Sequence, residues 1–426
     1  MATAVVVFAA LVVLFGACAH RLGRWNVTAP IVFVAAGSII GLSVESPSAS
    51  EVTWVRPIAE MTLVLVLFHD AAQVRPHDIR QDRGLVARTL GIAFPLTLLA
   101  GFLLARAVFP DQPVMLSLLV AAALAPTDAG LGAATVLNPI VPVRVRRLLN
   151  VESGLNDGLA TPVALFAIAA LAGTYGLRPA ASLAQAAAAI AWGVAIGIAV
   201  GVVGAKLLGW SRARDWSTSE TRALGVLALP VIAFGGAELV HGNGFVAAYV
   251  AGTALTGAGE WLAEEHSALH LTEVLTGPLG FIVWAVFGVV AVPRILGAIG
   301  WQEVLFAVMS LTVLRMGPMA LALLGTGLRA PTLLFVGWFG PRGLVSVVFT
   351  MIAVESLVMD EQLSAALSIV GLTVVLSVLA HGLSAGPLAQ RYGNWVDRNR
   401  PTAETRGDVS APAFHPQPRG SILRQG

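Results

Sequence analysis

The stretch LLNVESGLNDGLATPVALFAIAALAG, residues 148–173, is apolar for most of its length yet carries two carboxylates near its start. It is long enough to cross a bilayer, which takes roughly 20 apolar residues. Helical spacing places Ser153 and Asp157 on one face and Glu152 and Asn156 on the adjacent face. If the helix enters the bilayer at its first residues, Asp157 lies roughly 12 Å deep, near the midplane. Charged side chains at such a depth are costly and usually mark an ion or proton pathway.

The composition of the whole chain indicates the same environment. Of the 426 residues, 57% are hydrophobic and only 12% are charged, and the mean hydropathy is +0.81. Soluble domains carry about 25% charged residues. Apolar runs recur from end to end, so the sequence predicts an all-α polytopic membrane protein embedded in a lipid bilayer. The formal net charge of +2 gives no reason to expect a nucleic-acid partner, and the single Cys18 allows no intramolecular disulfide.

About thirteen membrane spans can be placed along the chain. We expect them at about 2–20, 27–43, 54–70, 86–107, 114–137, 149–172, 180–208, 222–240, 243–258, 268–290, 301–323, 332–355 and 363–385. Most of the 26 Lys and Arg residues fall in the loop after the first span, in every second loop after it, and in the C-terminal tail. Cytoplasmic loops carry the excess of Lys and Arg. We therefore expect a protein of the cell membrane with its N-terminus outside and its C-terminus in the cytoplasm. The loop 259–270 fits poorly, because it should be cytoplasmic but has no Lys or Arg.

Two of these spans are interrupted by helix breakers near their centres. ALAPTDAGLG, residues 123–132, places Thr127 and Asp128 directly after a proline, and GWFGPRGLVSV, residues 337–347, places Arg342 between a proline and a glycine. Proline removes a backbone donor and glycine weakens a helix. Free carbonyls, a hydroxyl and a carboxylate at the first break make an oxygen-rich cation site. Interrupted spans in the two halves of a transporter indicate the substrate site and an inverted repeat.

A few more polar residues lie within predicted spans. Asp70 follows a histidine at the end of the third span, where it is either a site residue or a solvated acid, and Arg315 lies in the eleventh. Because an unpaired buried charge is strongly destabilising, we expect Glu152 to pair with Arg342 or Arg315. The seventh span carries a glycine stripe over residues 193–204, which permits close helix packing.

These motifs, taken in order, resemble one family of membrane transporters. LAPTDA (124–129), LLNVESGLNDGLATP (148–162) and GWFGPRGLVSVVF (337–349) look like the monovalent cation:proton antiporter-1 family, the NhaP-type sodium/proton exchangers. LVLFHDAAQVRPHDIR (65–80) and GNGFVAAYVAGTAL (242–255) resemble two further spans of that family. The resemblance covers about residues 25–390.

The resemblance implies a fold of about thirteen transmembrane helices with inverted repeats, in which the broken helices of spans 5 and 12 cross. It further implies a homodimer whose core domain moves against the dimer interface like an elevator. The implied units are dimerisation helices at 1–72 and 222–290, a core transport domain at 84–175 and 301–388, and a connecting helix at 180–208. The tail at 391–426 is polar and Arg-rich and is predicted to be disordered and cytoplasmic.

The resemblance also implies the site and its cargo. It places sodium at Asp157, Asp128, Thr127 and Ser153, with Asp70 near the ion. Asn156, Glu152, Arg342 and Arg315 are then structural or charge-compensating residues. We expect Asn156 to support the broken helices, with Glu152 and Arg342 paired behind it. Because Asp157 cannot hold a proton and a cation at once, sodium or lithium would compete with protons for its carboxylate. The Asn-Asp pair resembles the electroneutral branch of these exchangers, and no cofactor is expected beyond the transported ions.

Three alternatives remain open on the sequence. A potassium/proton antiporter would use the same oxygen chemistry and the same mechanism. A sodium/organic-anion symporter is more remote. GLND at 154–157 comes within one residue of the GxGD pattern of intramembrane aspartyl proteases, but Asn156 replaces the second glycine and Arg342 would have no task there. We therefore expect a transporter rather than an enzyme.

Overall fold

The computed structural model describes residues 2–43, 55–128, 130–131, 138–177 and 182–406, and every regular element in these ranges is helical. The helices are α1 (Ala2–Arg24), α2 (Ala29–Ser43), α3 (Val55–Gln73), α4 (Pro76–Gln81), α5 (Arg83–Arg88), α6 (Phe94–Val108), α7 (Val114–Leu124), α9 (Val143–Thr174), α10 (Leu183–Ala213), α11 (Ser219–Leu239), α12 (Gly244–Ala258), α13 (His270–Ala298), α14 (Trp301–Leu311), α15 (Val313–Ala322), α16 (Ala330–Trp338), α17 (Leu344–Ser356) and α18 (Glu361–Asn399). A π-helical turn, Thr89–Ala93, joins α5 to α6, and two 3₁₀ turns, Glu260–Ala263 and His266–Leu269, join α12 to α13.

The helices confirm a multi-pass membrane fold. Within the described residues, eight helical segments are long and apolar enough to cross a membrane, and four shorter apolar helices accompany them. The shorter ones include α7 and α17, which belong to the two spans with predicted breaks. The number thirteen stays a prediction, and residues 132–137, the far end of the predicted fifth span, lie outside the described ranges.

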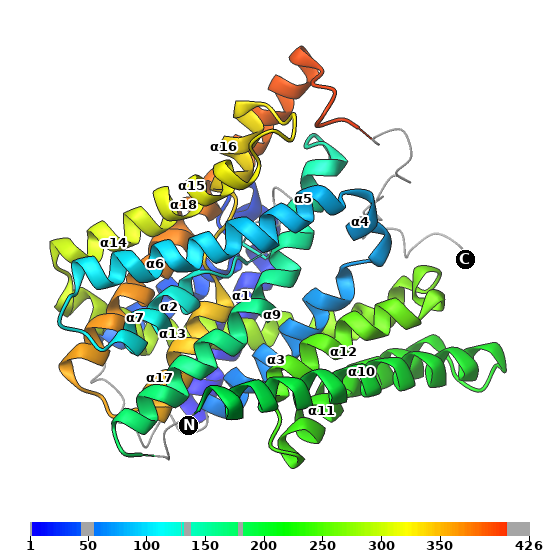
Figure 1. The fold of residues 1–426 in the computed structure, drawn as a ribbon, viewed down its shortest axis with the longest axis horizontal. Helices are drawn as coiled ribbons and strands as arrows, with labels where there is room; N and C mark the ends of the chain where they lie inside the picture. The colour runs from blue at the N-terminus through cyan, green and yellow to red at the C-terminus, as the bar shows by residue number, and fades with distance from the viewer. Residues whose placement is uncertain (1, 44–54, 129, 132–137, 178–181, 407–426) are drawn as a thin grey trace.

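Glycine sets how closely several helices approach. α10, α11 and α12 lie side by side, at the lower right in Figure 1. A Cβ on Gly197 of α10 would lie 2.6 Å from the Ala247 carbonyl oxygen of α12, and one on Gly201 would lie 2.5 Å from that of Ala251. The stripe predicted from the sequence therefore packs α10 against α12. Between α13 and α2, a Cβ on Gly288 would lie 2.4 Å from the Val34 carbonyl oxygen.

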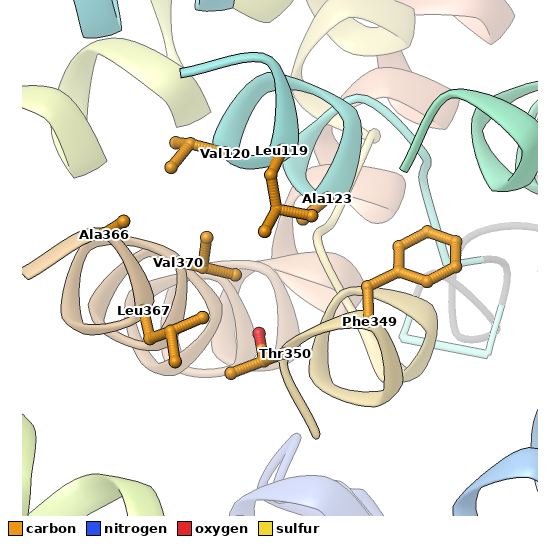
Figure 2. A pocket seen from close by; sticks show the side chains of 8 residues that line it. All are labelled: Leu119, Val120, Ala123, Phe349, Thr350, Ala366, Leu367 and Val370. Atoms are coloured by element: carbon orange, nitrogen blue, oxygen red, sulfur yellow. The ribbon is translucent and has the colours of Figure 1, made fainter. Parts of the chain in front are cut away.

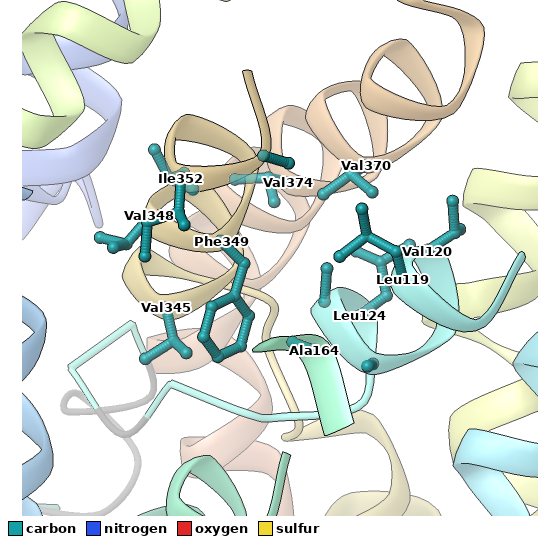
Figure 3. Packing of buried hydrophobic residues seen from close by; sticks show 14 of the residues in the cluster. Leu119, Val120, Leu124, Ala164, Val345, Val348, Phe349, Ile352, Val370 and Val374 are labelled. Carbon is teal, nitrogen blue, oxygen red and sulfur yellow. The ribbon is translucent and has the colours of Figure 1, made fainter. Parts of the chain in front are cut away.

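The largest apolar core joins the helices around the two breaks. Figure 3 shows α7, α17 and α18 packed through side chains such as Leu119, Phe349 and Val370, with Ala164 of α9 close by. Figure 2 shows a recess between α7, α17 and α18 whose lining is apolar except for Thr350. Its cavity volume of ≈ 10 Å³ is about that of a single water probe. The three helices are therefore closely packed at this recess.

The loop without Lys or Arg, 259–270, obtains its positive partners from neighbouring helices. Arg222 of α11 binds Glu265 at 2.9 Å, and Arg212 of α10 binds Glu264 at 2.8 Å. The Trp261 indole N–H donates to the Ala205 carbonyl at 2.9 Å. The loop therefore lies on the same side of the molecule as the α10–α11 connection, as the predicted topology requires.

The prediction of disorder from residue 391 is wrong for its first part. α18 continues to Asn399, and the segment after it folds back so that Glu404 is fully buried. One Glu404 oxygen accepts the Arg329 N–H and the Thr332 hydroxyl, each at 2.8 Å. The polar composition that suggested disorder includes a group that binds the N-terminal end of α16. Residues 407–426 lie outside the described ranges.

Candidate cation site

The two predicted breaks meet in the structure. α7 gives way to residues 125–128, which are not helical, and α16 and α17 are separated by residues 339–343. The Asp128 N–H donates to the Pro341 carbonyl at 2.8 Å. The two interrupted helices thus cross where each has lost backbone hydrogen bonds of its own, and the predicted crossing is confirmed.

Both carboxylate oxygens of Asp128 accept hydrogen bonds from backbone N–H groups. Oδ2 accepts the Leu344 N–H at 2.9 Å, and Oδ1 accepts those of Gly130 at 2.7 Å and Leu131 at 3.2 Å. A negative charge is favoured at a helix N-terminus, where backbone N–H groups lack partners. A Cβ on Gly343 would overlap the Asp128 carboxylate, so glycine makes this approach possible. Asp128 caps α17 in this arrangement, and its assignment as a sodium ligand stays a prediction.

Arg342 performs the reciprocal task for α7. Its guanidinium Nη1 donates to the carbonyls of Ala125 at 3.0 Å and Pro126 at 3.2 Å. These carbonyls lie at the C-terminal end of α7, where a positive charge is favoured. Arg342 is fully buried, and its Nε and Nη2 have no hydrogen-bond partner among the described residues. The Ser346 hydroxyl donates a hydrogen bond to a further carbonyl, that of Ala123, at 2.6 Å.

Glu152 pairs with Arg315 and not with Arg342. The contact is bidentate, with Nη1–Oε1 at 2.5 Å and Nη2–Oε2 at 2.7 Å, and both side chains are almost completely buried. A planar guanidinium matches a carboxylate in this way. The expected Glu152–Arg342 pair is therefore wrong, and Arg315 is the partner, because the Arg342 guanidinium is directed at the α7 carbonyls.

Thr127, Ser153 and Asn156 form a hydroxyl–amide cluster beside the first break. The Asn156 amide accepts the Thr127 N–H at 3.3 Å and donates to the Thr127 hydroxyl at 2.7 Å. The Thr127 hydroxyl also lies 2.9 Å from Ser153 Oγ, and either hydroxyl can be the donor in that hydrogen bond. The structure therefore brings together two of the predicted sodium ligands and the predicted structural amide.

Asp157 has a carboxylate oxygen that accepts no hydrogen bond from the described residues. Its side chain is 3% exposed, and Oδ1 has no hydrogen-bond partner among the described residues. The charges of Asp70 and Asp128 act on it electrostatically. One turn further along α9, Thr161 donates its hydroxyl to the Asp157 backbone carbonyl and not to the carboxylate. A buried acceptor without a donor is costly, and a proton or a cation would satisfy it.

Two other helices border Asp157. A Cβ on Gly154 would lie 2.9 Å from the Asp70 carbonyl oxygen of α3, and one on Gly158 would overlap the Tyr249 ring of α12. Asp70 itself is partly exposed and belongs to the last turn of α3, next to the buried His69, which contacts Thr272 of α13 at 3.0 Å. Asp157 therefore lies where α9 touches α3 and α12.

Sequence reasoning missed three residues around this site. Tyr249 packs against Gly158, the residue after Asp157, Ser377 accepts the Arg342 N–H at 2.6 Å, and His381 lies 2.9 Å from the Trp338 carbonyl oxygen. A buried histidine four residues after a serine in the long apolar helix 361–399 was a usable signal, since polar residues in a span need partners.

Crossed broken helices around buried acids define a helical secondary transporter. The family model for the transmembrane sodium/hydrogen exchanger matches residues 6–391, so the chain belongs to that family. This confirms the resemblance drawn from the motifs, and exchangers are transporters rather than enzymes.

Individual relatives agree with the family. The chain is 25% identical over 292 residues to a Na(+)/H(+) antiporter of Schizosaccharomyces pombe (strain 972 / ATCC 24843), in a match that covers 63% of this chain and 60% of that relative. Among solved structures, the sodium proton antiporter MjNhaP1 of Methanocaldococcus jannaschii at pH 8 has a TM-score of 0.72 at 18% identity, covering 92% of this chain and 99% of that one. A second structure of MjNhaP1, from electron microscopy, has a TM-score of 0.69 at 19% identity and covers 92% and 98%. These structures share the fold.

Proposed function

We propose that the protein exchanges sodium or lithium for protons across the cell membrane, with cation and proton competing for Asp157. The buried Asp157 Oδ1, which has no hydrogen-bond partner within the described part of the chain, carries this proposal. The other acids of the crossing are committed, because Asp128 caps α17 and Glu152 is bound by Arg315. Family membership and the name of the yeast relative support sodium and protons as the cargo.

The arrangement favours electroneutral exchange. Asn156 is uncharged, and its amide is occupied by Thr127, so it adds no charge that could change during transport. One carboxylate that binds either one proton or one monovalent cation exchanges them one for one. The Thr127 and Ser153 hydroxyls lie within reach of the same helix face and would complete an oxygen shell for sodium. No cofactor takes part in this scheme.

The domain assignment and the elevator motion are part of the same proposal. Asp157 lies on α9, in the proposed core (84–175 and 301–388), and it faces contacts from α3 and α12, in the proposed dimerisation unit (1–72 and 222–290). A core that slides against this contact would expose Asp157 to one side at a time. We further propose a homodimer with its N-terminus outside and its C-terminus in the cytoplasm.

Proton movement in everted membrane vesicles tests the function. A respiratory pH gradient is followed with a ΔpH-sensitive dye, and sodium, lithium or potassium is then added. We expect sodium and lithium to dissipate the gradient with wild-type protein and not with Asp157→Ala or Asp157→Asn. Asp111→Asn, at an exposed acid of the α6–α7 loop, is the matched control and should behave as wild type.

Each outcome separates one part of the proposal. Dissipation by potassium alone would keep the mechanism and change the cargo. Activity that survives in a well-expressed Asp157→Asn protein would remove Asp157 from its role. In proteoliposomes, a rate of sodium-driven proton flux that responds to an imposed membrane potential would refute electroneutrality.

A further inference from the structure

Two side chains of α18 form hydrogen bonds at the second break, residues 339–343, and at the end of the helix before it. Ser377 and His381 are one turn apart and almost completely buried. Ser377 Oγ accepts the Arg342 N–H at 2.6 Å, and His381 Nε2 lies 2.9 Å from the Trp338 carbonyl oxygen at the end of α16. The His381 ring also packs on the Trp338 indole, with ring centroids 4.8 Å apart. α18 thus contacts the chain on both sides of the Gly340–Pro341 step.

One hydrogen-bond direction on His381 is set by its partner. The Trp338 carbonyl can only accept, so Nε2 carries a hydrogen and donates it. Nδ1 lies 3.2 Å from the Ser377 hydroxyl and 3.0 Å from the Ser377 backbone carbonyl. It can accept from the hydroxyl or, when protonated, donate to the carbonyl. In either case His381 and Ser377 connect the Arg342 N–H to the Trp338 carbonyl.

This series of hydrogen bonds matters because the broken segment cannot pair all of its own backbone N–H groups. Pro341 has no N–H, and the Arg342 N–H has left helical geometry, so Ser377 supplies the acceptor that a continuous helix would provide. Such a network rigidifies a buried site only when every member is satisfied. The Arg342 side chain is thereby fixed where its guanidinium reaches the carbonyls of Ala125 and Pro126.

We propose that Ser377 and His381 are positioning residues for the cation site and act through Arg342. The carbonyls that Arg342 binds directly precede Thr127, and Thr127 is held by Asn156, the neighbour of Asp157. A shift of the Arg342 backbone would therefore displace Thr127 relative to Asp157. This inference rests on the proposed exchange at Asp157 and adds two residues that touch neither the ion nor its ligands.

The test separates apparent cation affinity from the amount of working protein. Ser377→Ala, Ser377→Thr, His381→Asn and His381→Gln are reconstituted in proteoliposomes, and the initial proton flux is measured against sodium concentration. We expect Ser377→Ala and His381→Asn to raise the KM for sodium roughly 3- to 10-fold, the effect of losing one buried hydrogen bond. The maximal rate should change less. Ser368→Ala, at another buried serine of α18, is the control and should keep the wild-type KM.

Conservative variants and a combination sharpen the test. Ser377→Thr keeps a hydroxyl, and the His381→Gln amide can still donate to the Trp338 carbonyl, so each should restore most of the sodium affinity. The double variant Ser377→Ala/His381→Asn should cost no more than the larger single change, because residues of one network are not additive. Sodium-dependent shifts of the thermal unfolding midpoint give the same ranking without turnover.

Two results have distinct meanings. An unchanged KM in Ser377→Ala and His381→Asn, with or without a loss of maximal rate and thermal stability, would show a structural role only and overturn the inference. A wild-type protein that moves no protons in response to any cation gradient would reject the proposed function, and the inference with it.

Discussion

The Asp128 carboxylate accepts the backbone N–H of Leu344 at 2.9 Å, so an acid from the first broken helix caps the second. In the opposite direction, Arg342 from the second broken helix binds carbonyls at the C-terminal end of α7, in the first broken helix. Negative charge is favoured at helix N-termini and positive charge at C-termini. Each break therefore carries the charge that the other helix end requires. The crossing is therefore held by contacts of its own two charged residues, and Asp157 takes no part in them.

Removing the Asp128 cap should destabilise the crossing. We expect Asp128→Ala to lower the free energy of unfolding by about 1–2 kcal/mol, because α17 loses an N-terminal cap and its charge. Asp128→Asn keeps an acceptor oxygen and should cost less. Thermal unfolding midpoints of the purified protein in detergent provide the measurement, with Asp111→Asn as the exposed control. Equal midpoints for Asp128→Ala and wild type would contradict the capping role.

Gly343 should tolerate no side chain. A Cβ there would overlap Asp128 Oδ2, and backbone on both sides leaves the carboxylate little room to retreat. We therefore expect Gly343→Ala to lower both the thermal midpoint and the sodium-driven proton flux. Gly317→Ala is the matched control, because a Cβ at Gly317 of α15 would meet no atom within 4 Å. That control should be neutral or slightly stabilising, since alanine favours a helix. A fully active Gly343→Ala protein would show that Asp128 does not need its present position.

The Glu152–Arg315 pair should contribute to folding more than to cation affinity. Glu152→Gln leaves the Arg315 guanidinium buried without a countercharge, which costs about 3–5 kcal/mol. The double variant Glu152→Leu/Arg315→Met removes both charges and should recover much of that loss. Expression level, thermal midpoint and the KM for sodium are measured for the single and double variants. A stable Glu152→Gln protein whose only defect is weak sodium affinity would make Glu152 part of the ion site.

The sequence predicted those features that a single segment determines. Proline and glycine at mid-span indicated both breaks, and depth along one helix indicated Asp157. It favoured Arg342 over Arg315 as the partner of Glu152 and was wrong, because spacing along the chain does not show which helices face each other. Ser377 and His381 were missed for the same reason, since their partners lie on α16 and in the break after it. The segment around Glu404 was predicted to be disordered because its overall composition is polar. Composition does not show that one acid in such a segment is buried against another helix.

Glu404 should stabilise the N-terminal end of α16. Its carboxylate lies at the start of that helix, where it accepts the Arg329 N–H and the Thr332 hydroxyl, and the Arg144 guanidinium binds the Ala403 carbonyl next to it. Replacing Glu404 with alanine removes the acceptor and the charge from the α16 N-terminus. We expect faster backbone hydrogen exchange in a peptide covering residues 325–335 and a lower thermal midpoint.

Two variants distinguish the Glu404 contact from a general effect of charge near the C-terminus. Glu404→Gln keeps an acceptor oxygen and loses only the charge, so its exchange rate should lie between those of wild type and Glu404→Ala. Asp397→Asn, at an exposed acid near the end of α18, should leave exchange in residues 325–335 unchanged. Because α16 leads directly to the break that contains Arg342, Glu404→Ala should also reduce the sodium-driven proton flux. Unaltered exchange at 325–335 in Glu404→Ala would mean that α16 holds its first turn without the C-terminal segment.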